Sequence, residues 1–95
     1  MERTMTFLKP IYDGRKSFYN KAVVEQTFDG ANETQKLYSY NTLVAEILIN
    51  TDINFKSAFV YGTYSATTLR HIKEFLKQNG FTADSKKQIE KDYLN

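Results

Sequence analysis

The chain of 95 residues contains no cysteine, one proline and four glycines. Without cysteine it can form no disulfide and offers no thiolate to a metal ion. No apolar run reaches the roughly 18 residues that a membrane-spanning helix needs, and the N-terminus lacks the apolar stretch of a secretory signal. We therefore expect a soluble, cytoplasmic protein without membrane association, held together by a packed apolar core.

An excess of one charge is also lacking, because 13 basic and 11 acidic residues leave a net charge of +2. A domain that binds polyanions over its whole surface is normally strongly basic, so any contact with nucleic acid would need a local patch. Aromatic residues are plentiful instead, with seven Phe and seven Tyr, and each buries a large area. At this length we expect one domain, residues 1–95, with an aromatic-rich core.

The first two thirds of the chain predict β-strands. Segments 4–8, 18–28, 36–49 and 53–61 have the apolar spacing of strands, and the polar segment 30–34 between two of them is expected to be a loop. In segment 36–49, alternate residues including Leu37 and Leu43 would form the buried face. These segments predict an antiparallel meander of three to four strands.

Two helices are expected after the strands. Ser65 is a suitable N-cap, and Leu69, Ile72 and Phe75 recur at helical spacing. Gly80 suits the left-handed position that ends a helix. The pattern predicts a main helix at about 66–79 and a short one at about 85–93, with Asp84 or Ser85 as its cap. Strands followed by helices on one face of the sheet make an α+β fold.

Catalytic groups are scarce in this sequence. His71 is the one histidine, and it lies at the border of the apolar helix face, where we interpret it as a structural residue with one nitrogen hydrogen-bonded. No second histidine or suitably spaced carboxylate accompanies it, and capping explains the neighbouring Ser and Thr residues. We expect no metal, no cofactor and no enzymatic activity. A small ribonuclease toxin is the enzymatic alternative, although such toxins usually place their helices before most of their strands.

Ten residues in three groups are candidates for binding a partner. In the first group, basic residues interleaved with aromatics suit binding of single-stranded nucleic acid or of a protein. The second group consists of exposed tyrosines, which are typical of an interaction patch. The third is a basic stripe on a helix, which suits binding of phosphates or acidic surfaces. Glu74 could pair weakly with Arg70 one helical turn away. Each group also has an ordinary interpretation as a solvated turn, strand or helix face. The candidates are Tyr12, Arg15, Lys16, Tyr19 and Lys21, then Tyr38 and Tyr40, then Arg70, Lys73 and Lys77.

Three stretches of the sequence, YDGRKSFYNKA at 12–22, LYSYNTLVAEI at 37–47 and YSATTLRHIKEFLKQNGF at 64–81, are similar to a known group of proteins. The chain resembles small proteins from phages and conjugative elements of low-GC Gram-positive bacteria. The three stretches cover about 40 of the 95 residues. The chain departs from the pattern at Asn20, where these proteins commonly have glycine. The group has no agreed catalytic residues to transfer.

This resemblance implies a mobile-element accessory protein that acts on host machinery, as inhibitors of CRISPR effectors do. We expect a binding protein that inhibits a host-defence complex such as a CRISPR–Cas effector, acting as a monomer or weak homodimer. The slightly basic charge argues against mimicry of DNA and favours contact with guide RNA or an acidic protein face. The alternative is a nucleic-acid-binding accessory protein that uses the six basic candidates among the ten residues.

Overall fold

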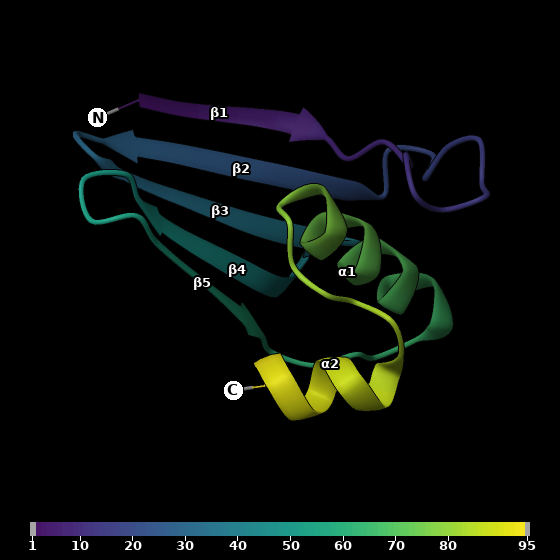
Figure 1. Ribbon diagram of the computed structural model, residues 1–95. Helices are drawn as coiled ribbons and strands as arrows, with labels where there is room; N and C mark the ends of the chain where they lie inside the picture. Colours follow the sequence, from purple (N-terminus) through teal and green to yellow (C-terminus); the bar gives the residue numbers. More distant parts are fainter. Residues whose placement is uncertain (1, 95) are drawn as a thin grey trace.

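The chain folds into one antiparallel sheet followed by two helices (Figure 1), so the α+β prediction is confirmed. A computed structural model describes residues 2–94, and none of its helices is long and apolar enough to cross a membrane. The strands pair in chain order, β1 to β5. The elements are β1 (Glu2–Phe7), β2 (Ala22–Asp29), β3 (Asn32–Ser39), β4 (Thr42–Asn50), β5 (Phe55–Val60), α1 (Ala66–Gln78) and α2 (Lys86–Tyr93).

The sheet has five strands, so the prediction of three to four was too low. Segment 36–49 is split by a two-residue turn in which Tyr40 and Asn41 both have positive φ, 51° and 68°. Such turns suit hairpins because their twist matches that of the strands. Part of the expected loop 30–34 is also strand, because Asp29 pairs directly with Asn32. The start of β3 was not predicted because its first residues are polar, and the turn between β3 and β4 was not predicted because it contains no glycine.

A similar turn explains why β2 starts at Ala22 and not at Phe18. Tyr19 and Asn20 have φ of 53° and 61°, and the N–H of Lys21 donates to the carbonyl of Phe18 at 3.0 Å. Asparagine tolerates this left-handed conformation better than most residues, and glycine adopts it without strain. A glycine at position 20 would therefore fit the same turn without strain.

Helix α1 lies across one face of the sheet, which we call the covered face, and α2 packs beside β5 at the edge of the sheet (Figure 1). Its strands contribute small and medium apolar residues, and α1 contributes the apolar stripe predicted from the sequence. The core consists of Leu8, Phe18, Ala22, Val24, Leu37, Val44, Ala45, Ile47, Val60, Ile72, Phe75, Leu76, Ala83 and Ile89.

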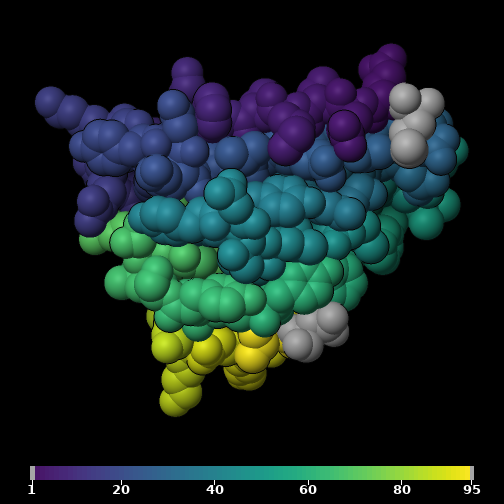
Figure 2. All heavy atoms as spheres, turned by 180° about the vertical axis from the view of Figure 1, so that it is seen from behind, coloured from purple at the N-terminus to yellow at the C-terminus, as the bar shows by residue number. Residues whose placement is uncertain are grey.

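The opposite face carries no helix of residues 2–94, and we call it the open face (Figure 2). A shift of register between Leu37 and Tyr38 turns part of β4 toward it. Leu37 pairs with Ala45, whereas Tyr38 pairs with Leu43, so Leu43 lies on the open face. The prediction that Leu43 is buried with Leu37 was therefore wrong, because a β-bulge breaks strict alternation.

Helix α1 begins and ends as the sequence predicts. The Ser65 hydroxyl accepts the N–H of Thr68 at 3.2 Å, which caps the first turn. At the other end Gly80 has a φ of +82°, and the N–H of Phe81 donates to the carbonyl of Leu76 at 2.9 Å. These contacts form a Schellman motif. Ser85 caps α2 in the same way as Ser65 caps α1.

Candidate functional site

The loop between β1 and β2 is attached to α1 by a buried carboxylate. Glu74 is 1% exposed and accepts the backbone N–H groups of Ile11, Tyr12 and Asp13 at 2.9, 3.0 and 2.9 Å. The Gln78 side chain donates a further hydrogen bond to it at 2.6 Å. The spacing in α1 had instead suggested a weak pair between Glu74 and Arg70. An acidic residue next to Phe75, among basic neighbours, was the one available signal of this role.

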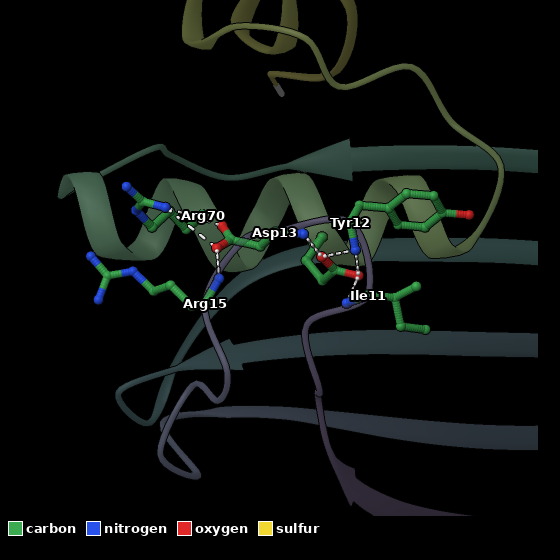
Figure 3. Close-up of polar contacts among 6 residues, drawn as sticks. Ile11, Tyr12, Asp13, Arg15 and Arg70 are labelled. Carbon is green, nitrogen blue, oxygen red and sulfur yellow. Dashed lines mark hydrogen bonds and ion pairs between the residues drawn. The ribbon is translucent and has the colours of Figure 1, made fainter.

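A second contact ties the loop to α1 through Asp13 (Figure 3). One Asp13 oxygen accepts the N–H of Arg15 at 2.9 Å, and Arg70 donates to the carboxylate at 3.3 Å. Burial acts to raise the pKa of Asp13, but the Arg15 N–H and the Arg70 guanidinium outweigh it and lower that pKa. Arg70 therefore pairs with Asp13. The expected pair between Arg70 and Glu74 does not form.

Between this loop and α1 lies a hollow of about 250 Å³, which we call the basic hollow. It brings together the helix stripe and the start of the predicted loop cluster, which are nearly 60 residues apart in the sequence. Figure 3 shows the side chains of Arg15 and Arg70 extending on the same side of the loop, beside Asp13. The hollow is lined by Tyr12, Asp13, Gly14, Arg70, Lys73, Glu74 and Lys77.

The charges in the basic hollow are not balanced. The Glu74 carboxylate accepts hydrogen bonds from the loop backbone, and the Asp13 carboxylate pairs with Arg70 and accepts the Arg15 N–H. The ammonium groups of Lys73 and Lys77 make no ion pair or hydrogen bond within residues 2–94. Cations without carboxylate partners attract phosphate or carboxylate groups from another molecule.

The remaining predicted residues lie outside the hollow. Lys16 is exposed further along the same loop. Tyr19 and Lys21 lie at the turn before β2, and the Tyr40 N–H donates to the Lys21 carbonyl at 2.9 Å, which places the two Tyr-Asn turns side by side. Tyr19 and Tyr40 are 75% and 51% exposed.

The predicted patch of Tyr38 and Tyr40 does not form. Tyr38 lies on the open face in a small hollow shared with Met5 and Val23. Tyr40 turns to the covered side, where its ring centre is 5.9 Å from that of His71. The left-handed turn at Tyr40 ends the strand alternation that would have placed Tyr38 and Tyr40 on one face.

His71 has the structural role expected, but it is buried and not at a boundary. It is 1% exposed, and its Nδ1 lies 2.8 Å from the hydroxyl of Ser39, which also contacts Thr68 at 3.0 Å. Burial lowers the pKa of His71, and the negative charge of Asp13 acts weakly in the opposite direction. Ser39 is only 2% exposed, so a substrate cannot reach its hydroxyl.

A sequence model of DUF8033, a family of unknown function, matches residues 6–91. The chain belongs to the DUF8033 family. The matched segment begins near the end of β1 and runs into α2, so β2 to β5, the loop and the basic hollow are within it. No curated protein and no solved structure matches the chain. Within residues 2–94, no three His, Asp or Glu side chains are grouped so that they could hold a metal ion.

Proposed function

We propose that this DUF8033 protein is a non-enzymatic binding protein that contacts an anionic partner through the basic hollow. The observation that carries the proposal is the uneven use of charge. Asp13 and Glu74 satisfy groups of the protein itself, whereas Lys73 and Lys77 are left to bind elsewhere. Tyr12, 61% exposed at the rim, adds an aromatic surface of the type enriched in interfaces.

The more specific form of this proposal is a mobile-element protein that inhibits a host-defence complex, such as a CRISPR–Cas effector, in the cytoplasm of a bacterial host. Its support is the resemblance to small phage and conjugative-element proteins. A nucleoprotein effector offers both phosphates and acidic side chains, which are the groups that the basic hollow would bind. A weakly basic chain with a local cationic site suits such a surface better than imitation of DNA does.

A second candidate is direct binding of nucleic acid by an accessory protein. The exposed Tyr12, which lines the same hollow as Lys73 and Lys77, favours it, because stacking and phosphate contacts together bind single strands. Phosphate contacts release counterions, so binding of this kind weakens steeply with added salt. A protein partner held partly by apolar contacts would depend less on salt.

The test is affinity capture from a Gram-positive host lysate with the tagged protein, with and without nuclease. Lys73→Ala with Lys77→Ala removes two cations from the hollow, and Lys86→Ala with Lys87→Ala removes two exposed cations from α2 as a matched control. We expect the first pair to weaken partner binding about tenfold and the control pair to leave it unchanged. Neither pair should alter the thermal midpoint by more than about 2 °C, because none of the four lysines makes an ion pair within residues 2–94.

The possible results separate the two candidates. A defence complex recovered in both samples supports inhibition, and recovery that disappears with nuclease supports the nucleic-acid candidate instead. Equal binding by the two variant pairs would show that the hollow is not the contact surface.

A further inference from the structure

Strand β1 has no neighbour on its outer side within residues 2–94, and all six of its residues are exposed (Figure 1). The Leu8 N–H donates to the Ala22 carbonyl at 2.9 Å, in register with the β1–β2 ladder. In an antiparallel ladder, alternate residues direct both backbone groups to the same neighbour. Arg3, Met5 and Phe7 therefore point their N–H and C=O groups away from β2, ready to pair with another strand.

The other edge of the sheet is different. Val60 of β5 forms a parallel bridge with Leu94, and α2 packs against β5. Part of that edge is thus occupied by the chain itself. An added strand would find continuous free backbone along β1, which is also the upper margin of the molecule in Figure 2.

The two residues next to Met5 in β1 are both threonine. Thr4 and Thr6 flank Met5, so two antiparallel copies centred there would place Thr4 of each against Thr6 of the other. Threonine pairs across strands are favourable. The same register places Met5 against Met5 and Arg3 against Phe7, all of which carry outward-pointing backbone groups.

We propose that a second copy of this chain pairs with β1 in this register, which joins two sheets into one of ten strands. Each opposed pair among Arg3, Met5 and Phe7 exchanges two hydrogen bonds across the junction. No like charges face one another, because Arg3 lies beside the Phe7 ring of the second copy and Glu2 beside its Leu8. Charge and shape therefore agree with pairing of identical strands.

Such a dimer gives a role to side chains that one copy leaves exposed. Met5 and Phe7 are 57% and 53% exposed, and both lie on the open face. A two-fold axis perpendicular to the sheet would place the open faces of both copies on one side and both basic hollows on the other. A partner with repeated anionic groups could then be bound at two points at once.

Cross-linking tests both the dimer and its register, and the absence of native cysteine makes each introduced thiol unique. Met5→Cys would place two thiols on directly opposed residues, about 5.5 Å apart at Cα. Phe7→Cys would place them four residues apart along the strands, about 13 Å. With a thiol cross-linker that spans only adjacent strands, we expect a covalent dimer from Met5→Cys and little from Phe7→Cys.

A charge exchange provides a second, independent measurement by analytical ultracentrifugation over a range of concentrations. Phe7→Glu would face Arg3 of the other copy twice per dimer and lower the dissociation constant roughly fivefold, whereas Phe7→Lys would raise it by a similar factor. The two variants are equally polar, so a general loss of stability would move both in the same direction. Lys73→Ala with Lys77→Ala should leave dimerisation unchanged, which separates this proposal from the one for the hollow.

Three results would overturn the proposal. They are a monomer at every concentration, stronger cross-linking from Phe7→Cys than from Met5→Cys, and a dissociation constant that does not respond to the charge at position 7. A monomer that captures an extended peptide along β1 would instead indicate that the edge serves a different protein.

Discussion

The two faces of the sheet are both rich in apolar side chains, yet only one of them is a core. Leu37 on β3 is fully buried beneath α1, whereas Leu43 on β4 lies half-buried on the open face. The same residue type, six positions away in one hairpin, thus has two different environments. The difference teaches that burial in this protein is decided by where the helices pack, and not by the hydrophobicity of a strand.

The largest effect should come from truncating the same residue on the two faces. Leu37→Ala removes packing against the helices and should lower the free energy of unfolding by about 2–5 kcal/mol. Leu43→Ala should cost less, about 1–2 kcal/mol, because its side chain is only partly buried and no helix packs on it. Urea denaturation of both variants measures the difference. Equal losses would mean that the open face is covered in solution, for instance by another copy.

A carboxylate on each side of the sheet gives a second contrast. Glu74→Gln weakens the hydrogen bonds that hold the 11–13 backbone and should cost about 1.5–3 kcal/mol. Glu25→Gln on the open face removes only an ion pair with the exposed Arg3 and should cost about 0–1 kcal/mol. Hydrogen exchange at the Ile11 and Asp13 amides should accelerate in the first variant alone. Unchanged exchange there would contradict the anchoring role of Glu74.

The smallest effect should be a pH dependence of the folding stability, which arises from His71, buried between α1 and the sheet. Burial lowers the pKa of His71 below its ordinary 6.5, so below that pH the unfolded chain binds more protons than the folded one. Stability is therefore complete above pH 6.5 and is lost as the pH falls through the lowered folded pKa. The pKa of Asp13 is lowered from 3.8, so its own contribution changes only at more acidic pH.

Thermal midpoints between pH 7.5 and pH 5 measure this effect. We expect them to fall in the native chain and to vary less in His71→Gln, which cannot titrate in that range. A native midpoint that rises on acidification would show that His71 is stabilised in its charged form.

Local patterns were enough to predict the helices. Ser65, the apolar stripe and Gly80 each act on groups within a turn or two of themselves, so start, face and end of α1 could be predicted from neighbouring residues. The α+β order follows from patterns of the same local kind. The ends of the strands were harder, because two turns use Tyr-Asn pairs where a glycine signal was expected.

The candidate site was only half visible in the sequence. Its cations could be named, and the spacing of Arg70, Lys73 and Lys77 placed them on one side of a helix. Their position next to Tyr12 and Asp13 depends on Glu74, which accepts hydrogen bonds from a loop more than 60 residues earlier in the chain. No periodicity within α1 could report a hydrogen bond to so distant a backbone.

By itself, then, the sequence determined the type and caps of the helices, the β-rich first half and the small net charge, because these depend on neighbours along the chain. Only the tertiary structure decided which sheet face is covered and where the register shifts. It also decided that Asp13 and Glu74 bind groups of the protein itself, whereas Lys73 and Lys77 have no carboxylate partner within residues 2–94. The physical reason is that burial and ion pairing are set by long-range packing, which brings together groups that local sequence keeps apart.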